Sequence, residues 1–576
     1  MRPSVATTLK PRSLQRRGRS QRRWYGLLFG GLLIWALLTA GIGVDDLINE
    51  RGWPLTARFL RASLHPDLSA PFLLLALEST LTTLAYAVCG SVVSLGLGLV
   101  GGLLASEVWW QTWAGAAAPR WRIRGPLVAI RTLIAVPRAI HEIIWGLLLI
   151  NIIGLDPLVA VLALGLPFGA VTAKVFADIL DETPRDSLDA LRNSGVPPLK
   201  ALVYSLYPQA LPDLISYTFY RFECAIRAVT VLGLIGAGGL GYQILLSLQS
   251  LRYEQMWTFL LALILLSGLI DVWGTFVRRQ YDLANRIDLN TAQLSGCQPR
   301  RPRRPASSRL MRGSILGVAG LIPWAFWYID ADWSKLVSPR TWRLLSGVAR
   351  DAWPPLIDAP FLGQLGRSMS QTLAMSILAM SFAGAVGLLL SFGAARNLVL
   401  PGGVLDSTVQ RGRGWWRWLI YGSSRGVLLL CRAISEPIWA LLVLFVVFPG
   451  ILPGALGLGI YNLGIVGRLM AEVAENTDPR PLQALQAQGV ARPQIFLYGV
   501  LPTTLPKSAA YVLYRWEVCI RATVVVGLVG AGGLGRLLTE QLSSLDYHRV
   551  TTTLLAFIAL TLAVDAVSSA ARRSLR

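Results

Sequence analysis

Charged residues are scarce in this chain, and lysine, cysteine and histidine are scarcer still. Asp, Glu, Lys and Arg make up 15% of the 576 residues, whereas hydrophobic residues make up 53%, and the mean hydropathy is +0.52. This composition excludes a single soluble globule, because several runs approach the roughly 20 apolar residues that span a bilayer. We therefore expect an all-α polytopic membrane protein.

The sequence also lacks the patterns that usually carry chemistry. A phosphate-binding loop requires Gly-Lys-Ser/Thr, and a residue other than glycine precedes each of Lys10, Lys174, Lys200, Lys335 and Lys507. The five cysteines and three histidines are scattered, without the spacing of a metal site or a disulfide framework. We expect no enzyme, no metal site and no cofactor in this chain.

The positive charge indicates orientation in a membrane. The net charge is +22, but the arginines gather beside apolar runs, as the positive-inside rule describes, so we expect no nucleic-acid partner. Residues 1–23 hold eight Lys or Arg and are expected in the cytoplasm, ahead of an uncharged run from Tyr25 to Val44. No clear small-residue cleavage site follows, so we expect a retained span rather than a signal peptide.

A tandem duplication organises the chain. The stretches Arg221 to Gly241 and Arg515 to Gly535 align at an offset of 294 residues and are identical at 14 of 21 positions. The expected domains are a basic cytoplasmic arm (1–24), a first transmembrane domain (25–280), a basic, Pro-rich cytoplasmic linker (281–313) and a second transmembrane domain (314–576).

Apolar runs predict six spans in each half, about twelve in all. After the Tyr25 to Val44 run, the expected spans of the first half are Pro71 to Ala105, Pro126 to Ile153, Leu158 to Val175, a fifth that contains Arg221 to Gly241, and Met256 to Val277. Those of the second half are Ser314 to Ile329, Phe361 to Phe392, Tyr421 to Phe448, Ile451 to Met470, Thr503 to Gly535 and Val550 to Ala571. An even number of spans per half predicts parallel repeats, and we expect an interfacial helix between Asp45 and Ser69.

A polar connection before each fifth span carries a repeated pattern. Both copies hold an alanine, a glycine five residues later and a proline thirteen residues after that glycine. The glycine permits a positive-φ turn between two short helices, and the proline can start the next helix without losing a needed donor. The pattern predicts a helical elbow that projects from the membrane.

These residues resemble the EAA loop of the permeases of ATP-binding-cassette importers. In that family the elbow is a coupling helix that sits in a groove of the cytoplasmic ATPase subunit. The resemblance implies these coupling positions: Asp189, Ala190, Gly195 and Pro208 in the first copy, and Ala484, Gly489 and Pro502 in the second. Gln483 departs from the pattern, because an acidic residue is usual there.

The fifth span sharpens the resemblance toward phosphonate importers. The sequence YRFExxIRxxTVLGxxGAGGLG is more similar to their permeases than to those of methionine or osmolyte importers, although Val524 replaces the threonine in the second copy. A second repeated set lies on the third span, with Arg138 and Glu142 in one copy and Arg432 and Glu436 in the other. Four residues apart, each pair is expected to share one helix face.

Charges inside a membrane are costly and usually find partners within the helix bundle. The fifth spans hold Arg221, Glu223 and Arg227 in one copy and Arg515, Glu517 and Arg521 in the other. Two interpretations remain open: all these charges form structural ion pairs, or the surplus arginines also line a path for an anion. We expect at least one pair to face the pathway.

The glycine run formally matches a dinucleotide-binding motif, but no βαβ unit surrounds it. We expect tight helix packing or a helix break at the external end of the span. The positions are Gly236, Gly238, Gly239 and Gly241, with Gly530, Gly532, Gly533 and Gly535.

The resemblance as a whole implies a tandem duplication of a six-helix type I (MetI-like) importer domain. One fused chain would form the translocation pathway for phosphonate, phosphite or a related phosphorus oxyanion, in a bacterial plasma membrane, with both termini cytoplasmic. It implies two ATP-binding subunits, which would hold ATP and Mg, and an external substrate-binding protein. An importer for an amino acid or osmolyte and an ion-coupled secondary transporter remain alternatives.

Overall fold

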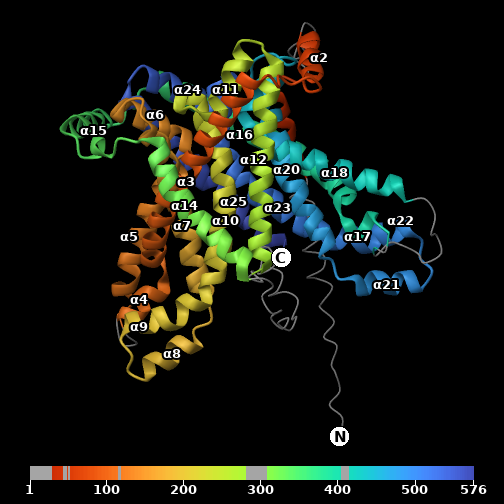
Figure 1. The fold of residues 1–576 in the computed structure, drawn as a ribbon, viewed down its shortest axis with the longest axis horizontal. Coiled ribbons are helices and arrows are strands. Elements are labelled where there is room, and N and C mark those ends of the chain that lie inside the picture. Colours follow the sequence, from red (N-terminus) through yellow and green to blue (C-terminus); the bar gives the residue numbers. More distant parts are fainter. Residues whose placement is uncertain are drawn as a thin grey trace.

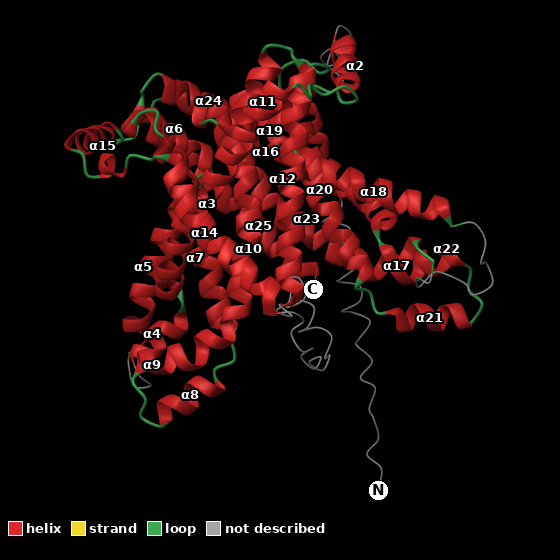
Figure 2. Ribbon diagram, in the orientation of Figure 1, coloured by secondary structure: helices red, strands yellow, loops and turns green. Residues whose placement is uncertain are grey.

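The structure is a computed structural model of the chain. It describes residues 29–42, 52–114, 119–280, 308–401 and 414–575, with residues 27, 49 and 403. The expected arm (1–24) and most of the expected linker (281–307) lie outside these residues. The described residues are mainly helical and contain no strand (Figure 2).

The first half begins with a helix at Phe29–Thr39. The helices that follow are α2 (Trp53–Ala62), α3 (Ala70–Ala105), α4 (Glu107–Ala114), α5 (Arg120–Ala139), α6 (Glu142–Ile153), α7 (Pro157–Glu182), α8 (Asp186–Asn193), α9 (Pro198–Ala201), α10 (Tyr207–Leu232), α11 (Gly239–Gln249) and α12 (Tyr253–Gln280). The expected interfacial helix between Asp45 and Ser69 corresponds to α2.

The second half repeats this order. Its helices are α14 (Ser308–Ile329), α15 (Pro339–Asp351), α16 (Ala359–Ala394), α17 (Arg396–Val399), α18 (Trp415–Ala433), α19 (Glu436–Val443), α20 (Ile451–Glu475), α21 (Pro479–Ala487), α22 (Arg492–Ile495), α23 (Leu501–Val526), α24 (Gly533–Ser543) and α25 (Tyr547–Leu575). α14 starts at Ser308, so the last residues of the expected linker are helical.

The described residues contain six helices long and apolar enough to cross a membrane, or up to ten spans if each of four bent helix pairs counts as one. Two shorter apolar helices, Phe29–Thr39 and Leu316–Ile329, occupy the expected first-span positions. The all-α polytopic fold is therefore confirmed.

Each half is built around two long helices in close contact. A Cβ atom on Gly90 of α3 would lie 2.5 Å from Leu164 of α7, and one on Gly102 would lie 2.6 Å from Phe176. Small residues at such crossings let helix backbones approach closely in lipid. α16 and α20 form the corresponding pair in the second half, where Gly459 lies against Phe382.

The first helix of each half packs against the other half. Ala36 of the helix near the N-terminus, and Ala40 in the turn that follows it, share a core cluster with Leu378 of α16 and Ala455 of α20. Conversely, Ala325 and Ile329 of α14 belong to the core cluster around α3. The two halves therefore form one interlocked bundle.

Figure 1 shows the matching elements of the two halves at the same ends of this bundle. α8 lies at the lower left of the view and α21 at the lower right, whereas α11 and α24 both lie near the top. This arrangement agrees with parallel repeats.

Candidate functional site

The third span is broken, which overturns the predicted pairing of Arg138 with Glu142. α5 ends at Ala139 and α6 begins at Glu142, with an angle of 87° between the two helical segments. Ile140 and His141 are extended, so Arg138 and Glu142 are not one helical turn apart. Glu142 instead lies 3.3 Å from the Nδ1 atom of His141, at the start of α6, where the helix dipole favours a negative charge.

The second half repeats the break, and the predicted pair of Arg432 and Glu436 is wrong for the same reason. α18 ends at Ala433, α19 begins at Glu436, and the segments meet at 98°. Glu436 is buried near His141 and Glu142, so both broken spans bring their acidic helix starts together between the halves.

Arg432 forms ion pairs with the other half. Its guanidinium lies 2.9 Å from Asp271 of α12 and 3.6 Å from Glu223 of α10. Asp271 also accepts from Arg468 at 3.4 Å, and Arg468 in turn pairs with Glu472 at 3.1 Å. We call this set the α12–α18 ion cluster. Asp271, Arg468 and Glu472 were absent from the predicted site, although an intramembrane Asp such as Asp271 is itself a functional signal in a sequence.

The charges of the fifth spans are satisfied differently in the two halves. Arg227 lies 3.4 Å from Glu223 one turn away, as its spacing predicts. The equivalent Glu517 binds Arg572 of α25 instead. Arg521 donates to two backbone oxygens, those of Glu517 at 3.2 Å and Arg138 at 3.1 Å.

Arg221 and Arg515 occupy equivalent positions but contact different partners. The Nε of Arg515 donates to the amide oxygen of Asn462 at 2.7 Å. Arg221 lies over the ring of Phe168, with 3.5 Å between the guanidinium carbon and the ring centroid. Its buried Nε has no hydrogen-bond partner among the described residues.

The glycine run both breaks the fifth span and allows close packing. Gly236, Gly238 and Gly239 have φ values between 74° and 91°, which L-residues rarely adopt, and the span bends by 59° there. The bend lets the Leu240 N–H donate to the buried hydroxyl of Thr83 at 2.9 Å. The second half repeats both features: Gly530, Gly532 and Gly533 have positive φ, and the Leu534 N–H donates to Thr372 at 2.9 Å.

The elbows form as the pattern predicts. Gly195 has φ of 80° between α8 and α9, and Gly489 has φ of 75° between α21 and α22. Buried Leu188 and Leu482 anchor the elbows to the following helices. The remaining predicted coupling residues on α8 and α21 are exposed: Asp189, Ala190 and Ala484.

The elbow prolines lie in the first turn of the next α-helix, as predicted: Pro208 is the second residue of α10 and Pro502 is the second residue of α23. These α-helices continue helical runs that begin near Pro198 and Arg492, which the sequence did not predict. A π-helical turn, Leu202–Leu206 or Phe496–Val500, directly precedes each proline. The wider turn redirects backbone hydrogen bonds around the missing proline donor, which explains its place inside the helix.

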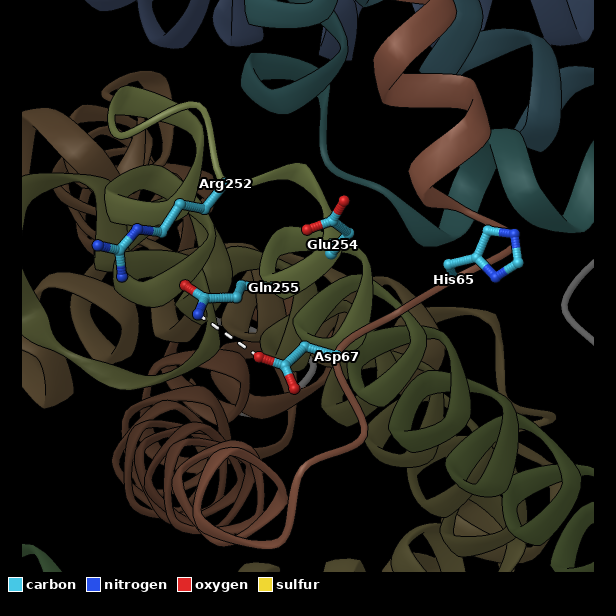
Figure 3. A pocket seen from close by; sticks show the side chains of 5 residues that line it. All are labelled: His65, Asp67, Arg252, Glu254 and Gln255. Atoms are coloured by element: carbon cyan, nitrogen blue, oxygen red, sulfur yellow. Dashed lines mark hydrogen bonds between the residues drawn. The ribbon is translucent and has the colours of Figure 1, made fainter.

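An open pocket of about 420 Å³ lies at the end of the bundle that carries α2 and α11. Figure 3 shows its lining of mixed charge, in which Gln255 donates to Asp67 at 3.5 Å. Hydrogen bonding from Ser69 lowers the pKa of Asp67 below its ordinary value. The other lining residues are His65, Arg252 and Glu254. None of the predicted site residues lines this pocket.

Comparisons with known proteins agree with the duplication. The sequence profile described as binding-protein-dependent transport system inner membrane component matches residues 113–283 and 413–576, one segment in each half. The phosphate-import permease protein PhnE of Mycolicibacterium smegmatis is 27% identical over 441 residues, which cover 76% of this chain and 76% of the relative. The phosphite transport system permease protein PtxC of Stutzerimonas stutzeri is 33% identical over 262 residues, which cover 45% of this chain and 88% of the relative.

Among solved structures, the inward-facing MetNI methionine ABC transporter is 19% identical to this chain, with a TM-score of 0.32. That match covers 38% of this chain and all of the solved one. The family profile, in contrast, matches more than half of the chain. The chain is a multi-pass transport subunit that belongs to the family of binding-protein-dependent transport system inner membrane components.

Proposed function

We propose that this chain forms the complete translocation pathway of an importer for a phosphorus oxyanion, such as phosphite, phosphate or a phosphonate. The relatives PhnE and PtxC are named for phosphate import and phosphite transport. Arginines outnumber glutamates two to one in each fifth-span stretch, at Arg221 and Arg227 and again at Arg515 and Arg521. An oxyanion that has been removed from water requires charge-assisted hydrogen bonds, which arginine side chains can donate.

Transport is driven by partner subunits in this proposal. Two ATP-binding subunits, holding ATP and Mg, dock on the exposed elbows around Gly195 and Gly489. A substrate-binding protein docks at the opposite end, near α11 and α24. The single observation that carries this proposal is the pair of matching elbows at one end of the bundle (Figure 1).

The proposal also fixes the orientation of the chain in a bacterial inner membrane. Both elbows and both termini lie in the cytoplasm, because Arg572 and Arg573 end the last span and basic residues flank the other inward loops. One fused chain supplies both halves of a transporter.

An uptake assay tests the function. The chain is expressed with its ATP-binding and substrate-binding partners in cells that lack their own phosphorus oxyanion importers, and entry of radioactive phosphate is measured. We expect ATP-dependent uptake, inhibited by unlabelled phosphite or methylphosphonate and unaffected by methionine or glycine betaine. Inhibition by methionine or betaine alone would indicate another solute, and uptake without the ATP-binding subunit would indicate a secondary transporter.

A further inference from the structure

The duplication allows each buried arginine to be compared with its counterpart 294 residues away. Arg432, Arg515 and Arg227 form one set, and Arg138, Arg221 and Arg521 form the equivalent set at the opposite junction of the halves. Each set takes two arginines from one half and one from the other. The two sets have the same residue type at every position, but their surroundings differ.

Every arginine of the first set has a side-chain partner. Arg227 and Arg432 both lie within 3.6 Å of Glu223, and Arg432 also binds Asp271 at 2.9 Å. Arg515 donates to Asn462. These arginines are matched by acidic or amide groups and connect helices within and between the halves.

Among the described residues, the second set does not repeat these side-chain contacts. The counterpart of Glu223 is Glu517, which binds Arg572. The counterpart of Asn462 is Phe168, which offers Arg221 only the surface of its ring. Within the described ranges, the side chain of Arg138 makes no hydrogen bond or ion pair.

Arg521 connects the three arginines of the second set. Arg521 donates from Nη1 to the backbone oxygen of Arg138 at 3.1 Å, and it lies within electrostatic range of both Arg138 and Arg221. Glu142 is also within range of Arg521, but one carboxylate offsets only one of the three arginine charges. The site therefore carries a surplus of positive charge between the halves.

We propose that Arg138, Arg221 and Arg521 form a single binding site for the transported phosphorus oxyanion, and that the equivalent set has a structural role. This inference rests on the proposed function and adds to it the place of binding. A tetrahedral oxyanion presents several acceptor oxygens, and guanidinium groups match them with paired N–H donors. Like charges held together away from water are unfavourable unless an anion compensates them, so the unmatched set is suited to a transient anionic ligand.

A structural explanation competes with this proposal. Asp565 is the counterpart of Asp271, so Arg138 could pair with Asp565 in another state of the transporter, as Arg432 pairs with Asp271 here. Loss of Asp565 would then resemble loss of Arg138. An anion site predicts instead that Asp565 is dispensable for uptake.

The test compares matched variants of the full chain, assembled with its ATP-binding and substrate-binding partners. The variants are Arg138→Gln, Arg138→Lys, Arg432→Gln and Asp565→Asn. Uptake of radioactive phosphate is measured in cells, and the yield of assembled complex is measured by co-purification with the ATP-binding subunit.

We expect Arg138→Gln to lower uptake at least tenfold while the complex still assembles, because charged hydrogen bonds to the anion are lost. Arg138→Lys should restore part of the uptake by restoring the charge, and Asp565→Asn should transport normally. Arg432→Gln should lower the yield of complex instead, because it leaves Glu223 and Asp271 without their buried cation. Normal uptake by Arg138→Gln would overturn the proposed binding site. An uptake defect in Asp565→Asn equal to that in Arg138→Gln would also overturn it. So would a loss of assembled complex in Arg138→Gln as large as the loss in Arg432→Gln. Absence of uptake by the unmodified chain would overturn the proposed function itself, which distinguishes the two failures.

Discussion

Gly241 lies against the backbone of its own broken span. A Cβ atom at this position would lie 1.9 Å from the carbonyl oxygen of Thr230, and one on the equivalent Gly535 would lie 2.4 Å from that of Val524. A backbone oxygen inside a packed helix cannot move aside as a flexible side chain can. The last glycine of each run is therefore required because a side chain would clash with the backbone, not because its φ is positive.

We expect Gly241→Ala to destabilise the protein by at least about 2 kcal/mol, because overpacking forces backbone shifts. Thermal unfolding of the purified chain in detergent would measure this as a lower midpoint. Gly268→Ala on α12 is the matched control, because no atom lies within 4 Å of its added Cβ atom. That variant should unfold at or above the unmodified midpoint, since alanine favours a helix over glycine. Equal midpoints for the two variants would contradict this account.

The sequence predicted many of the residues that carry buried charge, although not Asp271, Arg468 or Glu472, and it did not predict most of the ion pairs that they form. Arg227 and Glu223 are one helical turn apart on an unbroken helix, so spacing alone was sufficient. Arg432 binds Asp271, 161 residues away in the other half, and no local pattern contains that information. The pairing of Glu517 with Arg572, rather than with Arg521, depends in the same way on how α25 packs beside α23.

Each elbow is an element whose shape depends on one positive-φ glycine. A Cβ atom added to Gly195 would have no atom within 4 Å, so a larger residue there meets backbone strain rather than a clash. Left-handed conformation costs an L-residue about 1–2 kcal/mol, whereas asparagine tolerates it.

We therefore expect Gly195→Val to weaken the coupling that we propose for this elbow, and Gly195→Asn to preserve it. The measurement is ATP hydrolysis by the assembled complex when loaded binding protein is added. The valine variant should lose most of the stimulation, with a similar effect for Gly489→Val if both elbows act. Full stimulation with valine would show that the shape of the turn is not needed for coupling.

Helix existence was predictable, and the glycine runs predicted the break in each fifth span, but the break in each third span was not predicted. The apolar run from Pro126 to Ile153 is long enough for one span, and only the extended residues Ile140 and His141 divide it into α5 and α6. Both π-helical turns were also unexpected, because a proline after a polar loop is usually a helix start. In each case the local preference for an α-helix was correctly identified, and tertiary packing overrides it.

At the scale of the whole molecule, the two halves are interlocked rather than side by side. The first helix of each half packs against the long helices of the other, and the α12–α18 ion cluster joins them again. Hydropathy identifies such first helices but contains no information about which half they contact.

Near the α6–α7 turn, Lys335 of the second half also binds Asp156 of the first. Burial alone would raise the pKa of Asp156, but hydrogen bonds from Lys335 and from the Leu158 N–H outweigh it and lower that pKa.

The parallel arrangement predicts the sidedness of four equivalent positions. Ser194 and Gln488 are exposed at the two elbows, and Ser250 and Ser544 are exposed at the ends of α11 and α24. Each would be changed to cysteine in a chain whose native cysteines are replaced by serine, and labelled with a membrane-impermeant maleimide. We expect Ser250→Cys and Ser544→Cys to react from outside the inner membrane, and Ser194→Cys and Gln488→Cys to react only in inside-out vesicles. Both members of a pair must behave alike, because a rotation about the membrane normal keeps equivalent residues on one side. Labelling of Ser194→Cys and Gln488→Cys from opposite sides would contradict parallel repeats, and with them the docking of two ATP-binding subunits on one face of the bundle.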